Sequence, residues 1–134
     1  MPDHDRMRVL VVEDEWMLAF AIAALVKRLG CDVVGPAGHV REAEALGREA
    51  TVDAAILDIN LHGEMTFPIA RVLKERDLPF IFLTGYDSAV VPKEYAAAPV
   101  LQKPFSDEEL TSVLQQLLDR RGSNAAVPHG RVGT

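Results

Sequence analysis

The chain has 134 residues, of which 49% are hydrophobic and 25% charged, so its size and composition are those of one globular domain rather than a disordered segment. Its net charge of -6 argues against nonspecific binding to nucleic acid, which depends on clustered Lys and Arg. The single cysteine, Cys31, excludes an internal disulfide, and neither a membrane-spanning run of ~18 apolar residues nor an N-terminal signal peptide is evident. We therefore expect a cytoplasmic protein that binds neither a membrane nor nucleic acid.

Short apolar runs along the chain predict β-strands. Because these runs are continuous rather than alternating, they suit strands that are covered on both faces, as in a parallel sheet. In chain order the predicted strands are Arg8–Val12, Asp32–Val34, Ala54–Leu57, Pro79–Leu83 and Val100–Leu101.

Segments with helical spacing follow each predicted strand. Gly30 is a stop signal for the first helix, and Thr66 is a candidate N-cap of the third. Ser106 and Glu109 have the spacing of a capping box, which predicts the start of the last helix. The predicted helices cover residues 18–29, 40–50, 67–76, 92–98 and the stretch after Ser106.

Regular alternation of strand and helix with short connections predicts an α/β domain, a doubly wound five-stranded parallel sheet with helices on both faces. We place this domain at residues 8–121. Residues 1–7 are expected to be a flexible N-terminus. Residues 122–134 (GSNAAVPHGRVGT) have no periodicity and several helix breakers, so we expect a flexible tail there.

Polar residues gather where the predicted strands end. Ligands of open α/β sheets bind outside the carboxyl ends of the strands. Four of the five strands deliver a candidate functional group to that edge, in the order Glu13 and Asp14, Asp58, Thr84 and Gly85, and Lys103. Each group has an ordinary explanation by itself, such as acids that open a helix or a solvated lysine. The prediction of a functional site depends on their combination at one edge.

The combination indicates phosphoryl chemistry with a metal ion. Converging carboxylates repel one another unless a cation offsets their charge, and Mg²⁺ (or Mn²⁺) prefers carboxylate and carbonyl oxygens. A metal ion and a lysine can neutralise phosphoryl oxygens, and a hydroxyl can hydrogen-bond one of them. Asp58 is the candidate nucleophile, since a carboxylate can form an acyl phosphate.

The motifs that contain these residues resemble the receiver domain of bacterial response regulators. They are VLVVEDE at 9–15, AAILDINLHGE at 54–64, FIFLTGYD at 80–87 and LQKPF at 101–105, within a match over roughly residues 7–121. The resemblance implies a (βα)5 flavodoxin-like fold with strand order 2-1-3-4-5. It also implies a phosphorylation-dependent switch of a two-component system, which accepts its phosphoryl group from a histidine kinase or a histidine phosphotransfer protein.

The resemblance assigns a role to each metal-site residue. Asp58 matches the phosphoacceptor, and Asp14 matches a direct metal ligand. Glu13 matches an acid that acts through water, and Asn60 matches the position whose backbone carbonyl completes the metal site.

It assigns the phosphoryl-binding residues in the same way. Thr84 matches the switch hydroxyl, Gly85 the adjacent backbone N–H, and Lys103 the phosphate-binding lysine. The bond between Lys103 and Pro104 is usually cis in such domains.

The sequence also departs from the family pattern. Receivers usually have an aromatic residue three positions before the lysine, where this chain has Val100. Residues 82–86 instead resemble the subgroup nicknamed FAT GUY, which often occurs as a stand-alone receiver served by histidine kinases of the HWE type. Without a ring in the fifth strand, we expect the signal to pass through the loop after Thr84, with Tyr86 as a second switch residue and residues 87–99 reordering.

We expect the output of the signalling switch to be protein–protein contact or phosphate shuttling rather than enzyme turnover. Two other functions are alternatives to this switch. A phosphatase of the haloacid dehalogenase type expects a second acid two residues after the nucleophile, but Asn60 stands there and an amide is no general acid. A flavodoxin-like module expects a Ser/Thr/Gly-rich phosphate loop after the first strand, where this chain has the acids at 13–15.

Overall fold

The computed structural model describes residues 7–85 and 91–126, and it contains a five-stranded parallel sheet. The order across the sheet is β2-β1-β3-β6-β7, which confirms the predicted order 2-1-3-4-5 of the five main strands. These strands are β1 (Arg8–Val12), β2 (Asp32–Ala37), β3 (Ala54–Asp58), β6 (Phe80–Thr84) and β7 (Val100–Gln102).

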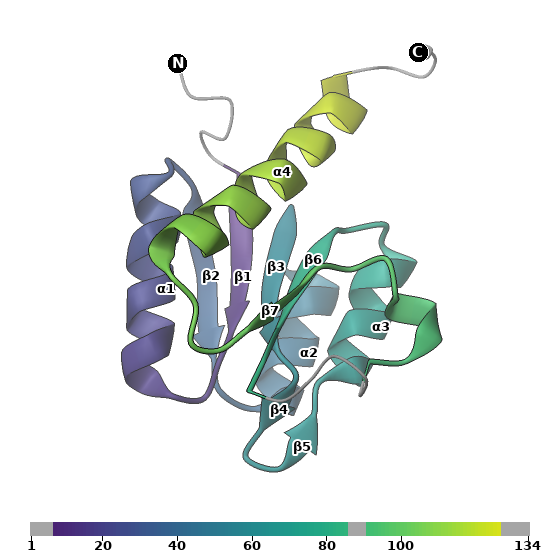
Figure 1. The fold of residues 1–134 in the computed structure, drawn as a ribbon. Helices are drawn as coiled ribbons and strands as arrows, with labels where there is room; N and C mark the ends of the chain where they lie inside the picture. Colours follow the sequence, from purple (N-terminus) through teal and green to yellow (C-terminus); the bar gives the residue numbers. More distant parts are fainter. Residues whose placement is uncertain (1–6, 86–90, 127–134) are drawn as a thin grey trace.

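Helices cover both faces of the sheet (Figure 1). They are α1 (Trp16–Arg28), α2 (Val40–Glu49), α3 (Phe67–Glu75) and α4 (Asp107–Ala126). Because successive side chains of a strand point to opposite faces, β1 contributes to two cores. Val9 and Val11 pack against α1 and α4, and Leu10 and Val12 pack against α2 and α3.

Several local signals act as the sequence predicts. Gly30 follows α1 with a φ of 86°, a left-handed conformation that glycine adopts without steric cost. The capping box closes at α4, because Ser106 N donates to Glu109 Oε1 at 2.8 Å and Glu109 N donates to Ser106 Oγ at 3.0 Å. The peptide bond between Lys103 and Pro104 is cis, as expected.

The predicted helix at residues 92–98 is wrong. The structure has only a short 3-10 turn, η2 (Lys93–Tyr95), which Pro92 precedes in an extended conformation. A segment this short gains little from helix formation alone, so its packing decides its shape. The Tyr95 ring is buried and lies 6.0–6.1 Å, between centroids, from the rings of Phe67, Phe80 and Phe82.

A small antiparallel hairpin that we did not predict follows β3. It consists of β4 (Asn60–Leu61) and β5 (Glu64–Met65). The two residues between them, His62 and Gly63, both have positive φ values, 51° and 88°. Two such residues are typical of the type I′ turn, whose twist matches that of paired strands.

Contacts between α2 and α3 join these neighbouring helices at their C-terminal ends. The guanidinium of Arg76, the C-cap of α3, donates to the backbone carbonyls of Gly47 and Ala50. These carbonyls belong to the last turn and the C-cap of α2, where helix carbonyls have no partner within the helix. One side chain of α3 therefore caps α2.

The last helix extends beyond the predicted end of the domain. Helix α4 continues to Ala126, past the predicted domain boundary at Arg121, and residues 127–134 of the predicted tail lie outside the described residues. In the part of the chain that the structure describes, no helix has the length and hydropathy needed to span a membrane.

Candidate metal and phosphoryl site

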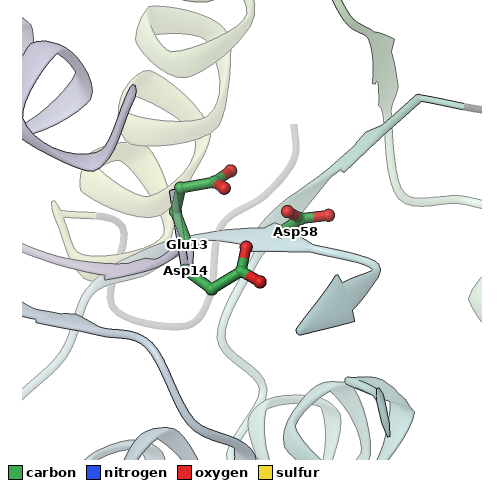
Figure 2. Close-up of side chains that lie close together, drawn as sticks. All are labelled: Glu13, Asp14 and Asp58. Carbon is green, nitrogen blue, oxygen red and sulfur yellow. The ribbon is translucent and has the colours of Figure 1, made fainter. Parts of the chain in front are cut away.

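Three carboxylates converge at the carboxyl edge of the sheet (Figure 2). Glu13 and Asp14 follow β1 and Asp58 ends β3, and the register of these parallel neighbours pairs Val12 with Leu57, one residue before the acids. Each acid contributes an oxygen to a group whose members lie within 4.8 Å of one another. Glu13 and Asp58 are only 3% and 5% exposed, so this cluster of three acids is largely removed from bulk water.

Lys103 brings a positive charge to the cluster of three acids. Its Nζ lies 2.9 Å from Asp58 Oδ2 and 3.1 Å from Glu13 Oε1. The lysine is placed by the end of the sheet, since its backbone N–H donates to the carbonyl of Thr84 at 2.8 Å. One ammonium thus faces two buried carboxylates.

Burial has opposite consequences for the two kinds of charge. It raises the pKa of Glu13 to about 7, and the nearby charge of Asp58 adds to this effect, although a hydrogen bond from Glu15 N and the proximity of Lys103 oppose it. Burial lowers the pKa of Lys103, but its hydrogen bond to Asp58 and its close contact with the charge of Glu13 outweigh that effect and raise the pKa above its usual range. The lysine is therefore charged at neutral pH, whereas burial makes ionisation of Glu13 costly.

Asp14 is held by the hairpin of β4 and β5. The backbone N–H of His62 donates to Asp14 Oδ2 at 3.0 Å, and the ring Nδ1 of His62 lies 3.6 Å from the same oxygen. Partial burial opposes ionisation of Asp14, but this backbone hydrogen bond and its other hydrogen bonds hold the pKa below its usual value. Asp14 is therefore an anion at neutral pH.

Asn60, Thr84 and Gly85 lie at the carboxyl ends of β3 and β6, and their predicted roles in metal and phosphoryl binding stay predictions. Asn60 N donates to Asp58 Oδ1 at 3.2 Å, which brings the backbone of β4 against the acceptor candidate. Thr84 is buried at the end of β6, and Gly85 follows it with open space around the position of a Cβ. Tyr86, the other predicted switch residue, lies outside the described residues.

Sequence reasoning missed one contact of Asp58. The hydroxyl of Thr66 donates to the backbone carbonyl of Asp58 at 2.7 Å, and Thr66 is completely buried. A threonine in front of a helix that begins Phe-Pro has the pattern of an ordinary N-cap, so no sequence signal distinguishes this role.

The three acids fit a hard divalent cation. Carboxylate oxygens are the ligands that Mg²⁺ and Mn²⁺ prefer. Oε1 of Glu13 is buried and accepts no hydrogen bond of good geometry from the residues that the structure describes, although it forms an ion pair with Lys103. An oxygen in that condition has a lone pair available for a metal ion or its water.

Comparison with known proteins agrees with this geometry. The family model described as "Response regulator receiver domain" matches residues 9–115. The sensory transduction protein LytT of Bacillus cereus is 30% identical over 132 residues, which are 96% of this chain and 54% of LytT. The chain thus spans about half the length of the curated relatives it matches.

Solved structures give the same result at higher identity. The solution structure of SdrG from Sphingomonas melonis Fr1 is similar at a TM-score of 0.73 and 38% identity, over 84% of this chain and 97% of SdrG. The BeF3-activated conformation of SdrG, from Pseudomonas melonis Fr1, is similar at a TM-score of 0.70 and 36% identity, over 85% and 98% of the two chains. With its sheet order, the acidic cluster and the matched residues, this chain belongs to the family of response regulator receiver domains.

Proposed function

We propose that this domain is a two-component signalling switch in the cytoplasm that accepts a phosphoryl group on Asp58 from a phosphohistidine of a histidine kinase or phosphotransfer protein. The observation that carries the proposal is the environment of the Asp58 carboxylate. It is buried, shares a cluster with Glu13 and Asp14, and lies 2.9 Å from the ammonium of Lys103. Family membership supports the same function.

The transfer needs an oxygen nucleophile and a way to neutralise charge. A carboxylate oxygen of Asp58 attacks phosphorus, and a P–O bond forms while the P–N bond of the phosphohistidine breaks. The electron pair of that bond goes to the imidazole nitrogen, so the imidazole leaves and an acyl phosphate remains. Lys103 offsets the negative charge of the phosphoryl oxygens, and the Thr84 hydroxyl and Gly85 N–H hydrogen-bond them.

The metal ion belongs to the same proposal. Glu13, Asp14, Asp58 and the backbone carbonyl of Asn60 would hold Mg²⁺ or Mn²⁺, with Glu13 acting through a water. A bound divalent cation supplies neutralisation of the charge that develops on the phosphoryl oxygens. Hydrolysis of the acyl phosphate, in the domain's own site, ends the signal.

A partner that delivers the phosphoryl group has to cover the edge of the site. Three large apolar side chains at the start of α1 are exposed there, Trp16 at 75%, Met17 at 64% and Phe20 at 72%. Exposed apolar side chains in one place favour an interaction surface over a solvated one. We propose that a protein phosphodonor binds this surface, a histidine kinase of the HWE type as the FAT GUY resemblance implies. We further propose an output through protein contact or phosphate shuttling.

Mass spectrometry with a small phosphodonor tests the assignment. The wild-type protein, incubated with acetyl phosphate and Mg²⁺, should gain the mass of one phosphoryl group, and EDTA should prevent the gain. Asp58→Asn should abolish it, whereas Asp32→Asn, on an exposed residue of β2, should not. Full labelling of Asp58→Asn would overturn the proposal.

The competing phosphatase function has no support at Asn60. Its side-chain oxygen accepts a hydrogen bond from Gly63 N at 2.8 Å, so the amide closes the hairpin, and an amide cannot protonate a leaving group. Turnover of a generic phosphomonoester at more than about 1 s⁻¹ would favour the phosphatase instead. Uptake of a flavin nucleotide would favour the flavodoxin-like module.

A further inference from the structure

The hydroxyl of Thr66 does not do what its position predicts. Thr66 is the N-cap residue of α3, where a threonine side chain usually accepts a hydrogen bond from the first turn of the helix. No such bond is present, and the hydroxyl donates instead to the carbonyl of Asp58, eight residues earlier, at 2.7 Å. A side chain that departs from a strong local preference points to a requirement elsewhere in the fold.

The backbone of Thr66 strengthens this link between β3 and α3. Thr66 N donates to the carbonyl of Ile59 at 2.9 Å, and the carbonyl of Thr66 accepts from Ile69 N at 2.9 Å and Ala70 N at 3.2 Å. Thr66 therefore bonds the last residue of β3 through its hydroxyl and the next residue, Ile59, through its N–H, and it bonds the first turn of α3 through its carbonyl. The hairpin of β4 and β5 lies between the two bonded segments in the chain.

Asp58 is consequently held both at its backbone carbonyl and at its side-chain carboxylate. Its backbone carbonyl receives the Thr66 hydroxyl, and its carboxylate receives Asn60 N on one oxygen and Lys103 Nζ on the other. The carbonyl orientation sets the peptide plane after Asp58, and Asn60 N belongs to the chain that follows that plane. A rotation at the carbonyl would thus move one of the two groups that orient the carboxylate.

We propose that Thr66 is a positioning residue for phosphorylation, which fixes the backbone of Asp58 so that its carboxylate stays aligned with Lys103 and the metal site. This inference rests on the proposed function of Asp58. The Thr66 hydroxyl bonds the backbone carbonyl of Asp58 and not its carboxylate, so it acts through the acceptor's own backbone. Alignment of a nucleophile is sensitive to small displacements, since an error of about 1 Å can cost about a hundredfold in rate.

A purely structural threonine makes a different prediction from a positioning hydroxyl. If Thr66 only fills the core, valine serves as well, because it has nearly the same shape, and the smaller serine serves worse. If the hydroxyl positions Asp58, serine retains the function and valine loses it. A carbonyl left buried without its donor moves toward another partner, which turns the peptide plane.

Three variants at position 66, compared with the wild-type threonine, separate the effect of side-chain size from that of the hydroxyl. Thr66→Ser keeps the hydroxyl in a smaller side chain, Thr66→Val removes it at constant size, and Thr66→Ala removes it in the smaller size. Thr111→Val, in α4 and away from the site, is the matched control for the exchange of threonine for valine. Urea unfolding first identifies conditions in which each variant is folded.

The decisive readout is the initial rate of Asp58 labelling by acetyl phosphate at saturating Mg²⁺, measured by intact mass. We expect the serine variant within about twofold of wild type, and the valine and alanine variants slower by about tenfold or more. Stability should instead follow side-chain size and packing, so the order of rates and the order of stabilities should differ. If valine fails to fold, the pair of serine and alanine still isolates the hydroxyl.

Two results would overturn the positioning role. One is labelling of the valine or alanine variant at the wild-type rate, and the other is a serine variant as slow as its alanine counterpart. In both cases the wild-type protein is still labelled on Asp58, so the proposed function stands. An unlabelled wild-type protein would instead remove the proposed function and this inference with it.

Discussion

The ammonium of Lys103 lies 2.9 Å from the Asp58 carboxylate, although 45 positions separate the two residues in the sequence. Asp58 ends β3 and Lys103 follows β7, and parallel strands deliver both to one edge of the sheet. This contact joins a charged group of high pKa to the candidate nucleophile before any phosphoryl group is present.

Replacing Lys103 by alanine should abolish the activated state while leaving the domain folded. We expect the free energy of unfolding to fall by about 1–2 kcal/mol, since the ammonium is partly exposed and Glu13 can take up a proton in its place. Beryllofluoride should no longer alter the spectrum of the variant, because the charge that balances its fluorines is missing. Heteronuclear NMR checks both points, and a wild-type response to beryllofluoride would contradict the assigned role.

Stability in the absence of metal should depend on pH through Glu13. Its folded-state pKa of about 7 lies above the ordinary value of 4.5, so the folded protein binds more protons than the unfolded chain between these values. The stabilisation is fully present below pH 4.5 and is lost as the pH rises through 7. Urea unfolding in EDTA should therefore show Glu13→Gln gaining stability relative to wild type across this window. Parallel curves for the two proteins would contradict the burial of that carboxyl.

Addition of Mg²⁺ should change the fluorescence of Trp16. This residue begins α1, two positions after Asp14, so a cation at the acidic cluster would bind close in the chain to its exposed indole. The titration should saturate at one site and disappear in Asp14→Ala, and Glu13→Ala should weaken binding less. An unchanged titration in Asp14→Ala would place the ion elsewhere.

Activation should alter amide exchange in residues 91–99 more than in α1 or α2. Val100 offers no ring to move, whereas the Tyr95 ring contacts Phe67, which directly follows Thr66 and its bond to Asp58. Hydrogen exchange with and without beryllofluoride measures this. Identical exchange of residues 91–99 in both states, with changes confined to β7, would show that the signal takes another route.

Much of the site follows from signals that act over short distances in the sequence. A continuous apolar run marks each buried strand, and the residue type directly after it determines what the sheet edge carries. Glu13, Asp14, Asp58 and Lys103 could be placed together from the alternation of strand and helix alone, because topology brings parallel strand ends to one edge.

The features that could not be predicted depend on contacts between distant residues. The 3-10 turn at Lys93–Tyr95 owes its shape to the burial of Tyr95 among aromatic rings of α3 and β6. The hydroxyl of Thr66 has two possible partners, an N–H of the first turn of α3, from which it would accept, and the Asp58 carbonyl, to which it donates, and only the packed structure decides between them. The turn at His62 and Gly63 had a local signal, a glycine within a polar stretch, but the paired segments are too short to recognise.

The Arg76 guanidinium limits how this domain can change shape. Because it caps α2 from the end of α3, the two helices cannot slide along or rotate against each other without uncovering the carbonyls of Gly47 and Ala50. The α2 and α3 layer is therefore a fixed frame. At the opposite edge of the same face, η2 is joined to α3 by one exposed bond, from Lys74 Nζ to the carbonyl of Glu94, and by a longer bond from the Tyr95 hydroxyl to the carbonyl of Phe67, so we expect rearrangement on activation at that edge. A partner that distinguishes the two states would have to contact that edge, while one that contacts α2 alone would bind both states equally.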